Sequence, residues 1–472
     1  MHRTESSPRV VIVGGGPGGY EAALVGRRLG AQVTLVEKAG PGGSAVLTDV
    51  VPSKSLIATA EWLSIVDRGP DLGIRLPDNL RGLRGHVDLG AVNSRLQALA
   101  SAQSADIRAR LRREGVEILA GTGRLVEPRK VAVRPNDGGA ERLLDAEVVL
   151  LATGATPRVL PTAVPDGERI LTWTQLYGLT AMPERLIVVG SGVTGAEFAG
   201  AYSMLGADVV LVSSRDQVLP SQDADAAALI EEVFTERGMT VMARTRGLGA
   251  RLTDDGVVVD LDGGRTVEGS HVLMAVGSIP TTADLGLVEA GVETTESGHI
   301  KVDKVSRTSV PGVYAAGDCT GVLPLASVAA QQGRIAMSHA LGDAVHPLSL
   351  KAVAANVFTT PEIATVGQSE AQLKARGRSY SVSMLPLARN PRAKMLGVRD
   401  GFVKVFTHTT SGTVLGAVVV GPRAGEQIYP LSLAVTHGLT VDQLAEASTV
   451  YPSMSGTIAE VARMLHQPQN DD

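Results

Sequence analysis

Two glycine-rich segments with identical spacing constrain the fold of this chain more than any other feature. Each follows a short apolar run and precedes a stretch of helical periodicity and a second apolar run. In both copies the second run ends 23 positions after the first glycine, at Glu37 and at Ser213. The glycines are Gly14, Gly16 and Gly19 in the first copy and Gly190, Gly192 and Gly195 in the second.

The repeated pattern predicts two strand–turn–helix–strand units, each built to bind a dinucleotide. Glycine allows the tight turn and lets the backbone approach a pyrophosphate, whose charge lies at the helix N-terminus. Each copy continues with a polar, turn-rich stretch, 115–146 or 238–269, and then an apolar run that closes at Gly154 or Gly277. One such motif is weak evidence, but a matched pair within an internal repeat indicates two nucleotide sites.

Length, charge and cysteine content exclude several classes of protein. A chain of 472 residues is expected to form about three domains, and a net charge of −5 gives no indication of a nucleic-acid partner. The segment MHRTESSPRV lacks the apolar core of a secretory signal, and no apolar run reaches the ~18 residues of a spanning helix. We therefore expect a cytoplasmic location without stable membrane insertion. The single cysteine, Cys319, excludes an intrachain disulfide and a cysteine-based zinc site, and no metal is expected.

Four further segments make the resemblance to a known family specific. They are ATGATPRVLP (152–161), GVYAAGDC (312–319), VFTTPEIATVG (357–367) and VYPSMSGTIAE (450–460). With the two glycine motifs, and in the same order along nearly the whole chain, they resemble the flavoprotein disulfide reductases. That family includes dihydrolipoamide dehydrogenase, glutathione reductase and mercuric reductase.

The resemblance implies an α/β fold with two Rossmann-like domains, for FAD and NAD(P)H, and a C-terminal α+β domain that builds a homodimer. The expected domains are 1–155 for the first part of the FAD-binding domain, 156–280 for NAD(P)H, 281–350 for the second, central part of the FAD-binding domain, and 351–472 for dimerisation.

The first repeat is expected to hold FAD. Glu37 ends its second strand, where a carboxylate can accept hydrogen bonds from both ribose hydroxyls. Asp318 matches the family residue that contacts the ribityl chain of the flavin. The expected FAD residues are Gly14, Gly16, Pro17, Gly19, Glu37, Lys38, Gly43, Lys54, Thr153, Gly154, Gly317 and Asp318.

The second repeat is expected to hold NAD(P)H. Relatives that prefer NAD end this strand with a carboxylate, but here Ser213 takes that position and Arg215 follows, so we expect both nucleotides to react and NADPH to react modestly better. Val193 falls where some relatives place a gating tyrosine, and its small side chain would leave the nicotinamide pocket open. The expected residues are Gly190, Gly192, Val193, Gly195, Glu197, Ser213, Ser214, Arg215 and Gly277.

The segment GGSAVLTDVVPSK, 42–54, lacks the residues that give the family its name. Ala45 and Val50 stand where the two redox cysteines are expected, and neither side chain can form a thiolate. Near the C-terminus, Tyr451 and Gly456 stand at the positions of the histidine and glutamate that protonate the leaving thiol. Because both halves of the disulfide chemistry are absent, reduction of lipoamide, glutathione disulfide or mercury is not expected.

The reducing side of the family's chemistry is still represented. Lys54, at the start of a helix predicted from Pro52, matches the lysine beside flavin N5, and Glu197 matches its ion-pair partner. The fixed positive charge of Lys54 should favour the anionic reduced flavin, and we expect Lys54 and Glu197, with Tyr451 of a second subunit, to be catalytic residues.

The favoured hypothesis is an NAD(P)H:quinone oxidoreductase. NAD(P)H would reduce FAD and leave, and a flat quinone-like acceptor would then bind in the apolar slot left by Ala45 and Val50. Two alternatives remain: an FAD-dependent transhydrogenase that passes hydride between NADPH and NAD, and a redox sensor without turnover. The sequence does not identify the physiological acceptor.

Overall fold

The computed structural model describes residues 7–67, 69–74 and 87–466 and divides the chain into two compact units. Unit 1 comprises residues 1–55, 91–158 and 277–349, and unit 2 comprises 56–90, 159–276 and 350–472. The bounds of the four domain segments expected from the sequence stay predictions. The first six residues, part of the segment inspected for a secretory signal, lie outside the described ranges.

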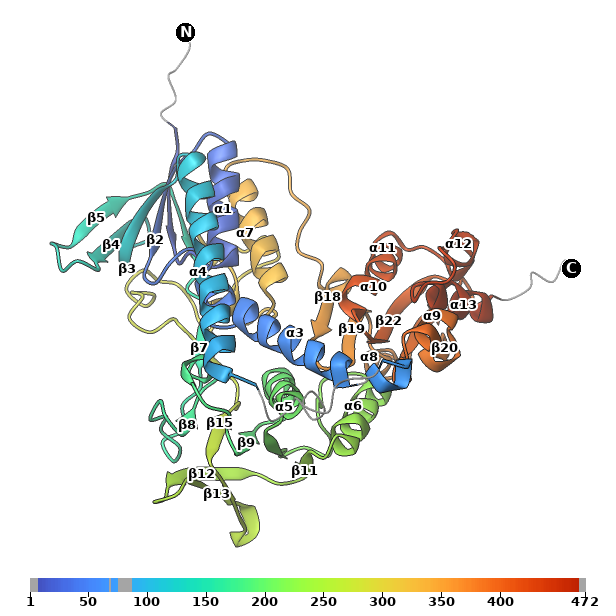
Figure 1. Ribbon diagram of the computed structural model, residues 1–472. Helices are drawn as coiled ribbons and strands as arrows, with labels where there is room; N and C mark the ends of the chain where they lie inside the picture. The colour runs from blue at the N-terminus through green and yellow to red at the C-terminus, as the bar shows by residue number, and fades with distance from the viewer. Residues whose placement is uncertain (1–6, 68, 75–86, 467–472) are drawn as a thin grey trace, which may run out of the picture. The chain divides into compact units, whose positions relative to one another are not determined.

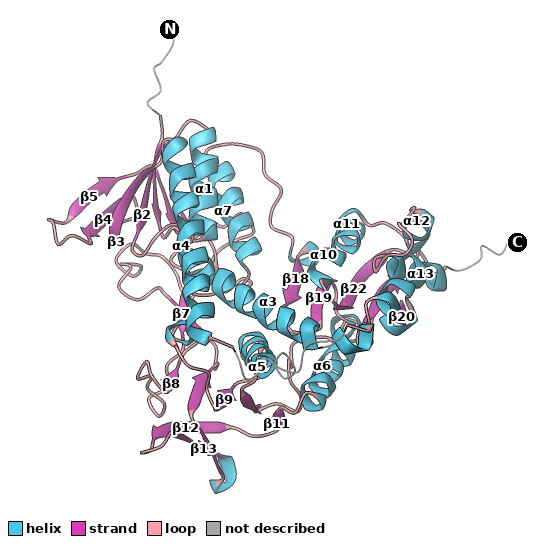
Figure 2. Cartoon of the chain, in the orientation of Figure 1, coloured by secondary structure: helices cyan, strands magenta, loops and turns pink. Residues whose placement is uncertain are grey.

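Unit 1 is built on a seven-stranded sheet in the order β17-β6-β1-β2-β3-β4-β5, in which the first five strands are parallel. Helices α1, α4 and α7 lie beside it (Figures 1 and 2). The strands are β1 (Arg9–Val13), β2 (Gln32–Glu37), β3 (Glu117–Glu127), β4 (Lys130–Pro135), β5 (Arg142–Asp145), β6 (Val148–Leu151) and β17 (Val313–Ala315); the helices are α1 (Pro17–Arg28), α4 (Leu89–Arg113) and α7 (Ala326–Ala340).

Both faces of this sheet are buried, which explains why its strands are apolar throughout. Because side chains alternate along a strand, Val10 and Ile12 pack into the cluster formed with the helices, and Val11 and Val13 pack into the opposite cluster. Helix α1 lies along α7, and a Cβ on Gly333 would overlap the carbonyl oxygen of Gly18. The sheet and its helices therefore fix the position of the glycine-rich turn between β1 and α1.

Unit 2 repeats this arrangement. Its parallel sheet has the order β11-β10-β9-β15-β8, and a three-stranded antiparallel sheet, β12-β13-β14, covers one face. The elements are β8 (Ile170–Leu171), β9 (Arg185–Val189), α5 (Val193–Leu205), β10 (Asp208–Val212), α6 (Ala224–Glu236), β11 (Thr240–Met242), β12 (Gly247–Leu252), β13 (Val257–Leu261), β14 (Thr266–Gly269) and β15 (His271–Met274).

The two copies share the backbone hydrogen bonds that shape their turns. In each copy, the N–H of the first motif glycine donates to a carbonyl at the end of the second strand. The residue after the closing strand, which is β6 in unit 1 and β15 in unit 2, donates its N–H to a carbonyl at the end of the first strand. The bonds are Gly14 N–H to Val36 O (2.8 Å) and Ala152 N–H to Val13 O (2.7 Å) in unit 1, and Gly190 N–H to Val212 O (2.9 Å) and Ala275 N–H to Val189 O (2.9 Å) in unit 2.

Unit 2 also contains an antiparallel sheet in the order β18-β19-β22-β21-β20, and helices of the C-terminal part pack against it. Its elements are β18 (Ala354–Val357), β19 (Glu362–Gly367), α8 (Glu370–Ala375), β20 (Tyr380–Pro386), α9 (Pro391–Met395), β21 (Phe402–His408), β22 (Val414–Gly421), α10 (Ala424–Gln427), α11 (Tyr429–His437), α12 (Val441–Glu446) and α13 (Gly456–Leu465). Across the described ranges, no helix combines the length and apolar character needed to span a bilayer.

A buried lysine joins this sheet to the second repeat. The Lys404 side chain, on β21, is 5% exposed, and its Nζ lies 3.1 Å from Asp223, 2.7 Å from Asp225 and 2.8 Å from Glu370. Asp223 also caps α6 by accepting from the Asp225 N–H. The hydrogen bond from Lys404 lowers the pKa of Glu370 to about 2. Burial alone would lower the pKa of Lys404, but hydrogen bonds to the carboxylates outweigh it and raise that pKa.

We predict that Lys404→Met destabilises unit 2 by about 3–5 kcal/mol, because it leaves Asp223 buried without its counter-charge. Urea denaturation followed by circular dichroism measures the loss. The matched control is Lys374→Met, since Lys374 also pairs with Glu370 but is 66% exposed, and its loss should leave the urea midpoint close to that of the parent protein. Equal stability of the Lys404→Met variant and the parent protein would contradict a stabilising role for the buried Lys404–Asp223 ion pair.

Candidate functional site

The glycine-rich turn of unit 1 is shaped to receive a phosphate group. Gly14 has φ +101°, and a Cβ there would overlap the Ala152 carbonyl, while a Cβ on Gly19 would overlap the Gly14 carbonyl. A Cβ on Gly16, in contrast, would meet no heavy atom within 4 Å, so open space lies over the turn. Helix α1 begins immediately afterwards with Pro17, and its N-terminal N–H groups face this space.

Glu37 ends β2 next to this turn, where the sequence places a ribose ligand. Its carboxylate accepts from the N–H groups of Gly15 (2.5 Å), Ala39 (2.7 Å) and Gly40 (3.2 Å). These bonds hold the carboxylate at the end of the parallel strands, where nucleotides bind in folds of this class. Lys38 is exposed, and its carbonyl accepts from the Asn136 side chain at 2.8 Å.

A cavity of about 210 Å³ opens beside Glu37, and two arginines of α4 line it together with Asn136. Arg108, Arg112 and Asn136 are not recognisable from the sequence, because an arginine on a helix and an asparagine after a strand have no distinctive local pattern. Open space over the turn, an anchored carboxylate and an adjacent cavity fit the adenosine diphosphate half of FAD. We propose that these residues hold it.

The second FAD segment surrounds Asp318. Gly317, with φ +84°, donates its N–H to the Gln332 side chain at 2.9 Å, and Asp318 begins a short helical turn. Burial raises the pKa of Asp318, nearby Asp49 raises it further, and His299 lowers it. Gln332 is 1% exposed, and sequence reasoning missed it, as it missed Asp49 and His299. All three come from segments distant in the chain.

The chain segments that follow β6 and β15 pair with each other as a two-stranded ribbon in unit 1. It pairs β7 (Ala155–Pro157) with β16 (Ser278–Pro280), and Arg158 donates to the carbonyl of Gly277 at 2.9 Å. Thr153 donates its hydroxyl to Thr281 O at 2.7 Å, and Gly154, at φ +69°, accepts from Thr281 N–H. The predicted cofactor residues Thr153, Gly154 and Gly277 thus lie next to one another at the base of this ribbon.

The segment without cysteines packs directly on the first glycine turn. Gly42 donates its N–H to Gly15 O at 2.7 Å, and a Cβ on Gly43 would lie 2.8 Å from the Cα of Gly16. Ala45 lies within the short helix α2 (Gly43–Leu47) that begins there. This position is beside the proposed FAD site.

Val50 is the first residue of α3 (Val50–Asp67), which begins two residues before the helix start predicted at Pro52. The earlier start follows from the Ser53 N–H, which donates to Asp49 O at 2.8 Å and closes the first turn around Pro52. Lys54 follows on α3 and is half-buried. Ala45 and Val50 therefore flank the turn that leads from α2 into α3.

Cys319, the single sulfhydryl of the chain, cannot replace the missing pair. Its side chain is fully buried, and its Sγ donates to Ala316 O at 3.3 Å. Burial raises the pKa of this thiol to about 11, so it stays protonated at neutral pH. The chain offers no thiolate for electron transfer.

Glu197, the expected partner of Lys54, lies on α5 and is 3% exposed. Its carboxylate accepts from the N–H of Phe358 at 2.8 Å, so it also ties α5 to the loop after β18. The ion pair with Lys54 stays a prediction.

The turn of unit 2 has the same geometry as the first. Cβ atoms on Gly190 and Gly195 would overlap the carbonyls of Ala275 and Gly190, and Gly192 faces open space. Val193 begins α5 and is 36% exposed. The strand end differs, because Ser213 is fully buried and its hydroxyl lies 2.7 Å from that of Ser191.

Tyr451 lies at the surface of the C-terminal part and is 81% exposed. The segment after it is held in place, since Asn390 donates its side-chain amide to Ser453 O (2.9 Å) and Ser453 Oγ accepts from Gly456 N–H (3.0 Å). An exposed ring on an anchored segment suits a contact with a second subunit, which stays a prediction.

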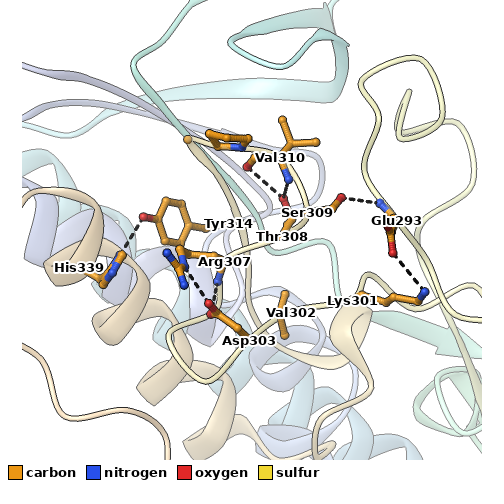
Figure 3. A pocket seen from close by; sticks show the side chains of 12 residues that line it. Glu293, Lys301, Val302, Asp303, Arg307, Thr308, Ser309, Val310, Tyr314 and His339 are labelled. Atoms are coloured by element: carbon orange, nitrogen blue, oxygen red, sulfur yellow. Dashed lines mark hydrogen bonds and ion pairs between the residues drawn. The ribbon is translucent and has the colours of Figure 1, made fainter.

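A larger cavity of about 620 Å³ lies near the beginning of β17, away from the carboxyl ends of the strands (Figure 3). Its charged and polar groups satisfy one another, with Arg307 2.7 Å from Asp303, Lys301 3.2 Å from Glu293, and the Tyr314 hydroxyl 2.9 Å from His339. We assign the cavity no part in the redox site.

We predict that an alanine substitution at each glycine turn weakens the binding of one cofactor and not of the other. Gly14→Ala should weaken FAD binding at least ~10-fold, and Gly190→Ala should leave FAD bound while weakening NADPH binding by a similar factor, because each Cβ overlaps a carbonyl. Flavin absorbance and nucleotide titration measure the two effects. Gly138→Ala and Gly238→Ala are matched controls, since both glycines have positive φ but open space around a Cβ. Loss of both cofactors from either variant would contradict separate sites.

Two family models match the chain, one after the other. The family described as pyridine nucleotide-disulphide oxidoreductase matches residues 8–333, and the dimerisation domain of the same family matches 353–462. The expected α/β fold with a dimerisation domain is thus confirmed.

Similar proteins cover nearly the full chain. It is 50% identical to "NAD(P)H dehydrogenase (quinone)" of Mycobacterium tuberculosis over 97% of its length and 94% of the relative. It is 32% identical to dihydrolipoyl dehydrogenase of Zymomonas mobilis, over 97% of this chain and 98% of the relative. The crystal structure of LpdA from Mycobacterium tuberculosis matches with a TM-score of 0.92 and 49% identity, covering 98% of this chain and 100% of that one.

These similarities confirm the expected class of enzyme and its cofactors. The chain belongs to the pyridine nucleotide-disulphide oxidoreductase family, as an oxidoreductase that uses FAD and NAD(P)H.

Proposed function

We propose that this enzyme transfers electrons from NAD(P)H through FAD to a quinone-like acceptor and does not reduce disulfides. The observation that carries the proposal is the redox-inert pair Ala45 and Val50 beside the first glycine turn, in a chain whose one thiol is buried. Bound FAD would supply the chemistry by accepting a hydride and passing two electrons to a second acceptor. The name of the 50%-identical relative, NAD(P)H dehydrogenase (quinone), supports the same acceptor class.

The residues around the missing cysteines favour an apolar acceptor. Ala45 and Val50 carry only alkyl side chains, and Val46 between them is buried at 7% exposure. An aromatic ring without charge can occupy such a slot without desolvating an ionic group. Lys54 would place a positive charge near the ring system, and the exposed Tyr451 would close the slot from a second copy of the chain.

A homodimer in the cytoplasm belongs to the same proposal. The family's dimerisation domain matches residues 353–462, and exposed apolar side chains of this part, among them Tyr429 and Tyr451, suit burial against a second copy. The single cysteine, which has no partner for an intrachain disulfide, supports the location.

We predict parallel initial-rate lines when NADPH and a benzoquinone are varied, because the nicotinamide leaves before the acceptor binds. Turnover with lipoamide or glutathione disulfide should be at least ~100-fold slower, since no thiolate relays the electrons. Intersecting lines, or brisk turnover of either disulfide, would contradict the proposal.

The same assay separates the two alternatives. A transhydrogenase would reduce an oxidised nicotinamide analogue faster than the benzoquinone. A sensor without turnover would show no bleaching of the flavin after anaerobic addition of NADPH. The intact second glycine turn and the buried Glu197 support turnover.

A further inference from the structure

The cavity of about 620 Å³ near the beginning of β17 lies within unit 1 and belongs to neither proposed nucleotide site (Figure 3). The proposed FAD residues lie near the carboxyl ends of the parallel strands, whereas Gly312 and Tyr314 line this cavity at the opposite end of β17. Sites for small molecules typically measure about 300–1,000 Å³. The cavity therefore has room for a small molecule other than the two cofactors.

The ion pairs at the cavity use only some of the donors that its cations carry. Asp303 accepts from the backbone N–H groups of Val305 and Arg307, both at 3.0 Å, and from Arg307 Nε at 2.7 Å. Among the described residues, the two Nη groups of Arg307 have no hydrogen-bond partner. Lys301 forms one hydrogen bond, to Glu293 at 3.2 Å, although an ammonium can donate three. The donors left over belong to cations, so they favour an anionic ligand.

The balance of charge limits how much negative charge such a ligand can carry. Arg307 and Lys301 pair with two carboxylates, those of Asp303 and Glu293, so the four charges sum to zero. A polyanion such as a nucleoside triphosphate would be repelled by these carboxylates, whereas a group with one or two charges can bind the free Nη groups of Arg307. The charges therefore favour a carboxylate or a phosphate monoester.

Apolar side chains form much of the remaining wall. Val302 and Val310 are partly buried against the core of unit 1, and Tyr314 is buried. The Tyr314 hydroxyl lies 2.9 Å from Nδ1 of His339, and when it donates to this nitrogen the neutral ring carries its proton on Nε2, which is a further donor. A ligand with a compact apolar body can thus contact the valines while its charged end binds Arg307.

We propose that this cavity is a binding site for a small amphipathic organic anion, a carboxylate or phosphate monoester with a compact apolar body. The two Nη groups of Arg307 bind oxygens of the anion, since a guanidinium can donate two hydrogen bonds to one carboxylate or phosphate. Val302 and Val310 contact the apolar body. The ligand is separate from FAD, NAD(P)H and the electron acceptor, so the proposal does not depend on the proposed function.

Calorimetric titration of the FAD-loaded protein, saturated with NADP⁺, measures the binding of phenyl phosphate. We expect one site per chain with a Kd of about 0.1–1 mM, and binding of uncharged benzyl alcohol at least ~10-fold weaker. Arg307→Met should weaken phenyl phosphate binding at least ~10-fold, because it removes the charge-assisted hydrogen bonds. The matched control is Arg251→Met, since Arg251 is an exposed arginine of unit 2 that lies 3.8 Å from Asp260, and this variant should bind phenyl phosphate as the parent does.

A second variant removes the space and keeps the charges. Val302→Trp places a large ring in the cavity and leaves Arg307 paired with Asp303, so it should also weaken phenyl phosphate binding at least ~10-fold. Should this variant not fold, Arg307→Met decides alone, because Arg307 is 56% exposed and its loss leaves the core intact. Absence of binding by the parent, unchanged binding by Arg307→Met, or equal affinity for benzyl alcohol would overturn the proposal.

Discussion

At each glycine-rich turn the backbone passes so close to a neighbouring strand that no side chain fits. The carbonyls of Ala152 and Ala275 occupy the space where a Cβ of Gly14 or Gly190 would lie. These contacts bring a helix N-terminus to the carboxyl edge of a parallel sheet, and the open space over Gly16 and Gly192 is the result. The proposed nucleotide sites of both repeats depend on this backbone approach rather than on any one polar side chain.

The cysteine-free segment depends on the same constraint. Helix α2 begins where Gly42 and Gly43 contact the first turn. Ala45 and Val50 therefore follow this turn at the positions where the resemblance places the redox cysteines, but both carry alkyl side chains. The fold can keep this segment because its helices are secured by backbone contacts. The proposed change in chemistry follows because neither alkyl side chain can form a thiolate.

The sequence predicted the features that have a local cause. Matched glycine spacing revealed the repeat and two nucleotide sites, since tight turns demand glycine. The α/β fold, the family and both cofactors were implied by the resemblance that these motifs carry with four further segments, and the comparisons confirm them. Contacts between distant segments stayed hidden. Asn136 and Gln332 reach the proposed FAD site only through folding, and their local patterns are those of ordinary turns and helices. The start of α3 was placed two residues late because Pro52 suggested a first helical residue, whereas it lies inside the first turn.

The central claim is that reducing equivalents are stored on FAD alone. Anaerobic titration of the FAD-loaded protein with dithionite, with thiols counted before and after, tests it most directly. The account predicts complete bleaching after two electrons per FAD and no new reactive thiol. Uptake of four electrons per FAD, or the appearance of reactive thiols on reduction, would contradict it.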